Sequence, residues 1–369
     1  MGYTREDGCR AWLTYGMINP DILAAILEEC GSAEAVYDEF QRSGGRFLKQ
    51  WRVNDASIAA LQEHAPRQQM HEMMVTMRKL DVGVIALGDN AYPDALRNIQ
   101  NPPAILFYRG NPDCLVGKCI AVVGSRTPTP RSEMATHDIC RELSDRGVTI
   151  ISGFAMGVDT AAHRGCLAGA SPTAAVLACG IDVIYPQENE DLREEIVAKG
   201  GVLLSEYPLG MRSGKHVFQM RNRIISGLAK AVLMMEARIQ SGSMITVQHA
   251  LDQGRDVFAY PGVPDSEASE GAHQLLREGA IYFTSAQDVL EDLSWAEDGP
   301  AITQQQKKAL PEMNDEQRRI YALLGQGEMS FDELSARSGI PTPQLSVSLT
   351  LMQMSGVIRA LPGKTYCRI

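Results

Sequence analysis

The stretch Cys119-Ile-Ala-Val-Val-Gly-Ser-Arg-Thr-Pro128 decides the fold, because it joins an uninterrupted apolar run to a loop of small and polar residues. Apolar residues that follow one another without alternation are typical of strands covered on both faces, as in a parallel sheet. The loop after the run offers backbone N–H groups, a hydroxyl and a cation from Gly124, Ser125 and Arg126. The stretch therefore predicts a buried strand with a polar loop at its carboxyl end.

The same pattern recurs along the chain. Further apolar runs occupy residues 148–151, 173–177, 202–204, 231–235 and 256–259. Stretches with helical spacing separate them, at residues 131–146, 159–168, 190–199, 223–229 and 243–253. Repeated strand and helix units favour an α/β fold with a doubly wound, Rossmann-like parallel sheet. We expect the segment that begins at Phe218 to be extended before it enters the helix at 223.

The segments on either side of this pattern differ in character. Residues 1–80 have helical spacing and predict a small helical bundle, and a strand pair at 81–112 opens the sheet domain, 81–295. Residues 296–312 are polar and without pattern, which indicates a linker. Residues 313–369 predict three helices and a hairpin, the order of a winged helix-turn-helix. Its third helix carries no positive charge, which favours protein contact or simple packing over the reading of DNA sequence.

Composition excludes several classes of protein. The chain has 369 residues, a net charge of -10 and 44% apolar residues, which is typical of a soluble protein with two or three domains. No window approaches the roughly 20 apolar residues of a membrane span, and the N-terminus lacks the apolar core of a secretory signal. The eight cysteines are scattered without a Cys-x-x-Cys pair, so we expect a reducing cytoplasm, no disulfide and no zinc site.

One segment reverses the overall charge. No Asp or Glu occurs between Gly210 and Met235, although five basic residues do: Arg212, Lys215, Arg221, Arg223 and Lys230. Arginine forks match phosphate oxygens, and Phe218 lies three residues from Lys215, so a ring and a cation could meet one nucleotide. The alternative to phosphate binding is that these arginines pair with carboxylates elsewhere in the chain, which is the usual role of an isolated Arg-x-Arg.

Loops at the carboxyl ends of parallel strands share one edge of the sheet, where ligands bind. Besides the Gly124 loop, this edge receives Ser152-Gly153, which leads toward a helix, and Ser241-Gly242-Ser243, which resembles an anion nest. Several such loops together predict a phosphate-binding face. The spacing matches neither a dinucleotide fingerprint nor a Walker P-loop. His163 could act as a general base beside Asp159, but no nucleophile accompanies the pair, so the sequence favours binding over catalysis.

The order of these loops resembles a known family. The segments that carry the resemblance are Gly124-Ser-Arg126, Ser152-Gly-Phe-Ala-Met-Gly-Val-Asp159 with Ala162-His163, Tyr185-Pro186, Ser205-Glu206, Arg221-Asn-Arg-Ile-Ile225, Ser241-Gly-Ser-Met-Ile-Thr246 and Tyr260-Pro-Gly262. They resemble the DNA-processing protein A (DprA/Smf) family over about residues 81–290. By the same resemblance the N-terminal segment looks like a SAM-like or helix-hairpin-helix-like domain and the tail like a DprA winged helix.

The resemblance implies a cytoplasmic, non-catalytic protein that binds single-stranded DNA in natural transformation. It implies protection of incoming strands, loading of the recombinase RecA and a homodimer, with no cofactor, metal or membrane. Phosphate contacts would carry over to Arg126, Lys215 and the Arg221-Asn222-Arg223 segment, and Phe218 would stack or wedge at a base. Three positions depart from the family pattern: Met156 replaces an Arg, Gln219 a Pro and His273 an Asn. The missing cation at 156 puts affinity in doubt, and Met156 is left out of the site.

The DNA-binding site expected from the sequence comprises Gly124, Ser125, Arg126, Ser152, Gly153, Lys215, Phe218, Arg221, Asn222, Arg223, Ser241, Gly242 and Ser243. The main alternative is a nucleotide-binding hydrolase on a related sheet, with Asp159, His163 and Glu206 as acid–base groups, although the glycine-rich loop of such hydrolases is absent. A transcription regulator acting through the winged helix is a third reading, and the uncharged third helix speaks against it.

Overall fold

A computed structural model describes residues 3–263, 266–296, 313–325, 327–354, 357–361 and 365–368. The chain divides into two compact units, Met1–Gly299 and Pro300–Ile369. The linker expected at 296–312 lies outside the described residues except for Ala296. None of the helices in the described ranges is long and apolar enough to cross a membrane.

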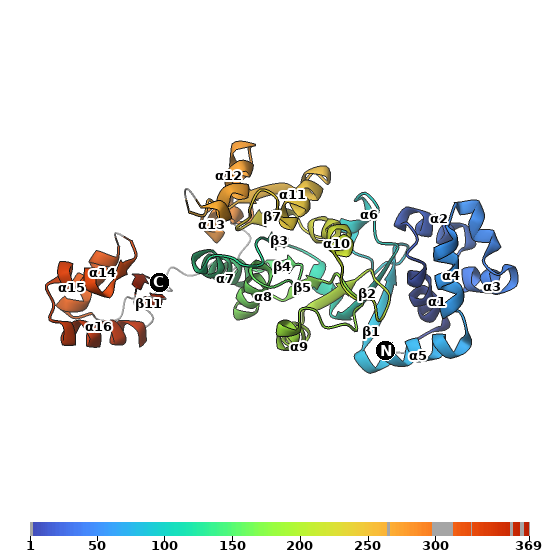
Figure 1. Cartoon of the computed structure of the whole chain (residues 1–369), viewed down its shortest axis with the longest axis horizontal. Helices are drawn as coiled ribbons and strands as arrows, with labels where there is room; N and C mark the ends of the chain where they lie inside the picture. Colours follow the sequence, from blue (N-terminus) through green and yellow to red (C-terminus); the bar gives the residue numbers. More distant parts are fainter. Residues whose placement is uncertain are drawn as a thin grey trace. The chain divides into compact units, whose positions relative to one another are not determined.

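A nine-stranded sheet forms the centre of the first unit (Figure 1). Its spatial order is β1-β2-β6-β5-β4-β3-β7-β8-β9. The strands are β1 (Val82–Ala86), β2 (Ile105–Gly110), β3 (Cys119–Val123), β4 (Thr149–Ser152), β5 (Thr173–Val176), β6 (Val202–Ser205), β7 (Ala231–Met234), β8 (Asp256–Ala259) and β9 (Ile281–Tyr282). From β6 to β9 all neighbours are parallel, whereas β2 pairs antiparallel with both β1 and β6. The predicted doubly wound sheet is confirmed.

The strand order reverses at β3. From β3 the chain proceeds through β4, β5 and β6 in one direction, and β7 then returns to the other side of β3. At such a reversal the loops after the two neighbouring strands turn away from each other and leave a crevice at the carboxyl edge. The topology therefore places the natural ligand position between the loops that follow β3 and β7.

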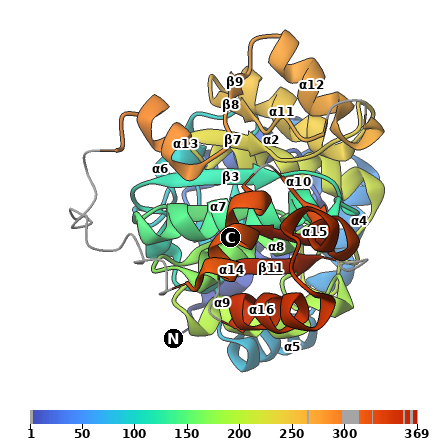
Figure 2. The same ribbon diagram turned by 90° about the vertical axis from the view of Figure 1, so that its left-hand side faces the viewer.

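Helices cover both faces of the sheet, as the continuous apolar strands require. They are α6 (Asp94–Arg97), α7 (Pro130–Asp145), α8 (Val158–Ala168), α9 (Glu190–Ala198), α10 (Lys215–Gly227), α11 (Gly242–Asp252), α12 (Glu270–Arg277) and α13 (Ala286–Asp292). On one face α7, α8 and α13 pack on Ile120, Val122 and Leu233, and on the other α10, α11 and α12 pack on neighbouring residues of the same strands. Figures 1 and 2 show α11 and α12 beside β7 and β8.

The expectation of an extended segment from Phe218 is wrong, because α10 begins at Lys215 and continues without a break to Gly227. Val217, Arg221 and Ile225 recur at four-residue spacing and are all buried, so they form the inner stripe of this helix. A sequence analysis that treats every cation as exposed misses this helical period, because an arginine lies within the buried stripe. Its burial is possible because backbone carbonyls accept its N–H groups.

Five helices precede the sheet: α1 (Arg5–Leu13), α2 (Pro20–Cys30), α3 (Ala33–Ser43), α4 (Asp55–His64) and α5 (Arg67–Leu80). Side chains of Thr4, Asn19, Ser32 and Asn54 cap four of them. The predicted helical region is thus confirmed. Its hydrophobic core is continuous with that of the sheet, since one cluster joins Trp12 to Phe107 of β2. Independent folding of residues 1–80, and their SAM-like character, stay predictions.

The described residues of the second unit form three helices and a small antiparallel sheet. The helices are α14 (Asp315–Leu324), α15 (Phe331–Ser338) and α16 (Thr342–Met354), and the strands are β10 (Met329–Ser330), β11 (Ile358–Leu361) and β12 (Thr365–Arg368). Ser330 and Glu333 form the predicted capping box at the start of α15. Ile320, Leu334 and Leu345 fill the centre of this unit. The predicted winged-helix arrangement is confirmed.

Candidate functional site

A cleft of about 750 Å³ opens at the carboxyl edge of the sheet, where the strand order reverses. Its walls come from the loops after β3, β4, β5 and β7, from the starts of α8 and α11, and from α10 as far as Ile225. The residues of the predicted site that line it are Gly124, Ser125, Arg126, Lys215, Phe218, Arg221, Asn222, Ser241, Gly242 and Ser243. The tertiary structure therefore gathers ten of the thirteen predicted residues around one space.

Two helices of eleven or more residues begin at this cleft, α10 and α11. Their N-cap residues, Gly214 and Ser241, line it, and no cap side chain accepts a hydrogen bond from the first turn of its helix. The first N–H groups of a helix have no partner within the helix and carry the positive end of its dipole. The cleft is therefore suited to an anion.

A buried carboxylate shapes the loop after β3. Glu236 is 2% exposed, and its carboxylate accepts hydrogen bonds from the N–H of Thr129 at 3.0 Å and from its hydroxyl at 2.6 Å. The backbone carbonyl of Glu236 also accepts the N–H of Ser125 at 2.7 Å. A Cβ atom at Gly124 would lie 2.7 Å from a methyl group of Val158, so only glycine fits there. These contacts hold the Gly124 loop against α8 and aim Arg126 at the cleft.

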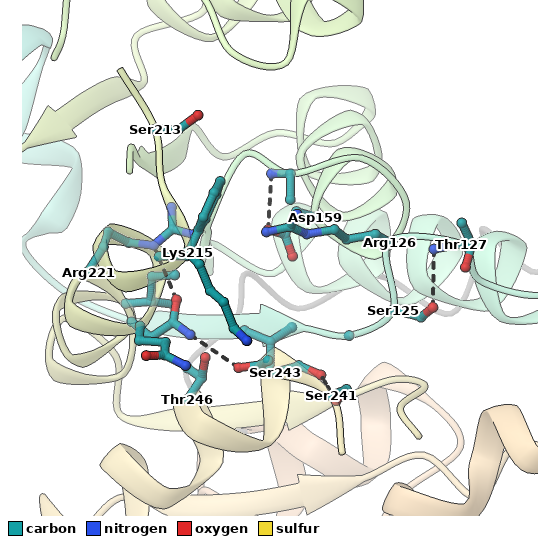
Figure 3. Close-up of a pocket in the computed structure, with 18 of the residues that line it drawn as sticks. Ser125, Arg126, Thr127, Asp159, Ser213, Lys215, Arg221, Ser241, Ser243 and Thr246 are labelled. Atoms are coloured by element: carbon teal, nitrogen blue, oxygen red, sulfur yellow. Dashed lines mark hydrogen bonds between the residues drawn. The ribbon is translucent and has the colours of Figure 1, made fainter. Parts of the chain in front are cut away.

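Among the exposed cations that line the cleft, Arg126 and Lys215 reach it from opposite sides (Figure 3). Arg126 comes from the β3 loop, and its guanidinium carbon lies 4.4 Å from the centre of the Phe218 ring. Lys215 is the first residue of α10, and its side chain extends toward Ser243 at the start of α11. Lys215, Phe218 and Asn222 are spaced three and four residues apart, which places them on one face of the helix. That face is the one turned to the cleft.

Arg221 lies at the floor of the cleft and is 3% exposed. Its Nη1 donates to the carbonyls of Gly153, at 2.7 Å, and Val176, and its Nε donates to the side-chain oxygen of Asn222 at 3.2 Å. Within the described residues no hydrogen bond engages Nη2, and no carboxylate lies within ion-pair distance. Burial lowers the pKa of Arg221 to about 10, against the opposing effect of Asp159, so the group stays charged at neutral pH.

Asp159, in the first turn of α8, is the acidic group that lines the cleft. Its carboxylate accepts the N–H of Ala155 at 3.1 Å and is 8% exposed. Burial raises the pKa of this carboxyl, and the charge of Arg221 opposes the rise. The carboxylate helps to balance the buried guanidinium without pairing with it directly.

Arg223 does not line the cleft, and the prediction that it contacts phosphate does not fit its position. Its Nη2 pairs with the Glu206 carboxylate at 2.6 Å, and its other nitrogens donate to the carbonyls of Asn101 and Met220, each at 2.8 Å. Residues two positions apart on an α-helix are rotated by roughly 200° about its axis. Arg221 and Arg223 therefore point to opposite sides of α10. The extended backbone expected from the sequence would have placed them on one side.

Ser152 and Gly153 lie behind the cleft instead of lining it. The Ser152 hydroxyl is fully buried and donates to the carbonyl of Val122 at 2.6 Å. A Cβ atom at Gly153 would lie 2.7 Å from Nη2 of Arg221, so the missing side chain leaves room for the guanidinium. Gly153 therefore positions Arg221, Ser152 ties the end of β4 to β3, and neither fits the role of a direct phosphate contact.

Several lining residues were not among the predicted site residues: Thr127, Asp159, Tyr185, Ser213, Arg238 and Thr246. Tyr185 follows β5 by nine residues, and the sequence included it in the Tyr185-Pro186 motif of the resemblance without naming it as a site residue. Arg238 and Thr246 flank the predicted Ser241 loop, and their positions after an apolar strand could have included them. The prediction of site residues therefore becomes less complete as the distance along the chain from the end of a strand increases.

The acid–base trio of the hydrolase alternative is not assembled. Asp159 lines the cleft, but His163 and Glu206 do not. His163 is fully buried, with its Nδ1 2.8 Å from the hydroxyl of Thr173, while Glu206 is engaged by Arg223. No group of three potential metal-ligating side chains that could hold an ion occurs within the described ranges. The geometry thus favours an anion-binding site over a catalytic one.

Burial lowers the pKa of His163 from 6.5 to about 3, with a smaller contribution from Arg221. In the unfolded chain the His163 imidazole therefore takes up a proton near pH 6.5, whereas in the folded chain it does so only near pH 3. His163 should leave stability unchanged above this window and reduce the free energy of unfolding as pH falls, by up to about 1.4 kcal/mol per unit. Denaturant titrations of the wild type and His163→Gln at several pH values would isolate this effect. Parallel pH profiles for the two proteins would contradict it.

Comparison with known families agrees with both units. A model described as DNA recombination-mediator protein A matches residues 83–294, and a model of a DprA winged helix domain matches residues 304–364. Protein Smf of Escherichia coli (strain K12) is 35% identical over 306 residues, which cover 81% of this chain and 80% of that protein. DNA processing protein DprA of Streptococcus pneumoniae (strain ATCC BAA-255 / R6) is 41% identical over 207 residues, covering 56% of this chain and 73% of the relative.

Two solved structures extend the similarity. DNA processing protein A (DprA) from Streptococcus pneumoniae has a TM-score of 0.65 at 33% identity, covering 79% of this chain and 99% of that one. DNA processing protein A from Helicobacter pylori has a TM-score of 0.53 at 30% identity, covering 60% of this chain and 98% of that one. The Helicobacter pylori protein is described as having a unique single-stranded DNA binding mode.

Proposed function

Because the chain belongs to the DprA/Smf family of DNA-processing proteins, we propose that its cleft binds the phosphate backbone of single-stranded DNA. The observation that carries this proposal is Arg221, a buried cation with no directly paired carboxylate and with Nη2 left unengaged beside the cleft. A buried charge without a partner is costly, and an anionic ligand would supply the partner. The single-strand binding of the Helicobacter pylori relative supports the choice of anion.

The groups around Arg221 fit the sugar-phosphate backbone of a nucleic acid better than they fit polyanions in general. Arg126 and Lys215 would neutralise phosphates, and the N–H groups of Gly242 and Ser243 would donate to phosphate oxygens. Phe218 would supply apolar contact for a sugar or base. Because the whole chain has a net charge of -10, attraction is confined to this basic cleft. Binding should therefore be tolerant of sequence and sensitive to salt.

From the family we further propose a non-catalytic role in natural transformation, in which the protein forms a homodimer, protects incoming single strands and helps to load RecA. The absence of an assembled acid–base trio supports binding without chemistry. The winged helix would serve protein contact, because α16 carries no cationic side chain.

The test replaces one cation at the cleft. Lys215→Gln should weaken binding to single strands of any sequence and make the slope of log K against log salt shallower by about one unit. Fluorescence anisotropy of labelled oligonucleotides across a salt series measures both. Lys230→Gln is the matched control, because Lys230 is exposed at the opposite end of β7, away from the cleft. Sequence-dependent loss, or equal effects of the two variants, would contradict the proposal.

The same assay separates the hydrolase alternative, in which the cleft would accept a single nucleotide. Asp159 within the lining favours that alternative to the extent that an acid there could exchange protons with a ligand. A mononucleotide that displaces the oligonucleotide efficiently and is then hydrolysed would replace our proposal. Failure of the mononucleotide to compete would remove the alternative.

A further inference from the structure

Tyr185 is an aromatic residue at the cleft to which neither the family resemblance nor the predicted site gives a role. It comes from the loop between β5 and α9, lines the cleft and is 43% exposed. Within the described residues its hydroxyl makes no hydrogen bond, and its ring contacts that of Phe218 at a centroid separation of 5.9 Å with a 56° tilt. An aromatic ring so exposed beside a polar cleft leaves apolar surface in water that a ligand could cover.

Phe218 is less available than its place in the cleft indicates. The guanidinium of Arg126 lies 4.4 Å from its ring centre, and that of Arg221 lies 5.8 Å away. The ring also packs with Tyr207 and Val217 beneath it. One face of Phe218 is therefore covered by a cation, and a base could stack on that face only after displacing Arg126. Tyr185 is the aromatic side chain of the cleft with the larger open surface.

The cleft thus offers two kinds of contact. The N–H donors at the start of α11, Lys215 and Arg221 are suited to phosphate. The rings of Tyr185 and Phe218, which lie against each other, are suited to a base. A volume of about 750 Å³ is in the range that accommodates a ligand of nucleotide size. One nucleotide could therefore place its phosphate against the donors while its base lies toward the rings.

We propose that Tyr185 stacks on an unpaired base of the bound strand and is the residue by which the cleft prefers single strands to duplex. The inference rests on the proposed single-strand binding. Phosphates are common to both forms of DNA, so the cations and N–H groups cannot distinguish them strongly. The faces of paired bases are already stacked inside a duplex, whereas an unpaired base is free to stack on an aromatic ring.

The experiment compares wild type, Tyr185→Ala and Tyr185→Phe on one oligonucleotide in single-stranded and duplex form, each across a salt series. Stacking contributes about 1–3 kcal/mol per base, so Tyr185→Ala should weaken single-strand binding by roughly 5- to 150-fold. Duplex affinity and the salt slope should not change, because no charge is lost. Tyr185→Phe keeps the ring and should bind as the wild type does.

An oligonucleotide with one abasic site moved along its length locates the contact. The wild type should lose affinity when the abasic site reaches the position that stacks, and Tyr185→Ala should not respond to it. Equal weakening of single-strand and duplex binding, or a changed salt slope, would overturn the stacking role. Unaltered binding by Tyr185→Ala would overturn this inference alone, whereas failure of the wild type to bind single strands would overturn the proposed function as well. Thermal unfolding of each variant checks its fold.

Discussion

Replacement of Arg221 by methionine is expected to weaken single-strand binding by roughly 10- to 150-fold, because a hydrogen bond from a charged group contributes about 1.5–3 kcal/mol. The guanidinium is held by the carbonyls of Gly153 and Val176, so its free Nη2 is fixed in direction before a ligand arrives. A fixed donor loses little conformational entropy on binding, and burial reduces the screening of its charge by solvent.

The same substitution should reduce stability by about 1–3 kcal/mol for each buried carbonyl that loses its donor. Arg221→Lys separates the two effects, since it keeps a positive charge but cannot bind the carbonyls with one nitrogen while presenting a second to the cleft. We expect the lysine variant to keep more affinity than the methionine variant while losing comparable stability. Anisotropy and denaturant titration on the same samples measure these quantities. A methionine variant that folds normally and binds with wild-type affinity would refute the assignment of Arg221.

Arg223→Met is expected to destabilise the first unit by about 3–5 kcal/mol, because it leaves the largely buried carboxylate of Glu206 without its partner. The Arg223 side chain is 4% exposed and that of Glu206 is 15% exposed, so solvent screens the pair only slightly. Single-strand affinity per folded molecule and the salt slope should be unchanged, since Arg223 lies outside the cleft.

The double variant Arg223→Met with Glu206→Gln supplies the control. It removes both charges and should recover part of the lost stability, as expected for two residues whose effects are not additive. Denaturant titration gives the stabilities, and the salt series gives the slope. A shallower slope for Arg223→Met would mean that the arginine contacts phosphate after all. Equal stabilities of the single and double variants would mean that the ion pair is not the source of the loss.

These two arginines also show how the fold and the site depend on each other. They are separated by one residue, yet one serves the cleft and the other fastens α10 to the segment around Asn101 and to Glu206. The carbonyl of Gly153 that holds Arg221 comes from the loop after β4. The site is therefore built from side chains of α10 and of loops far away in sequence, and from backbone groups of those loops.

The sequence by itself determined the strands from β3 to β8 but not β9 or the order of the strands, because its information is local. The runs at 119–123 and 256–259 coincide with β3 and β8, and the other predicted strands differ from the observed ones by a residue or so at either end. A continuous run of apolar residues can be buried on both faces in only a few kinds of fold. Gly124 indicates a loop, because only a residue without a side chain fits there. The motifs after the strands likewise indicated the edge of the sheet at which the cleft lies.

Only the tertiary structure decided which cations face the cleft. Arg221 is buried on a helix whose start the sequence placed too late, and its burial depends on carbonyls supplied by residues 153 and 176. Arg223 was expected beside it, because an extended chain puts alternate residues on one side, whereas a helix turns them about 200° apart. Tyr185 enters through the path of a loop that no local pattern specifies. The strands could be predicted because their apolar residues are consecutive in sequence. The partners of a charged side chain could not be predicted, because they come from distant parts of the chain.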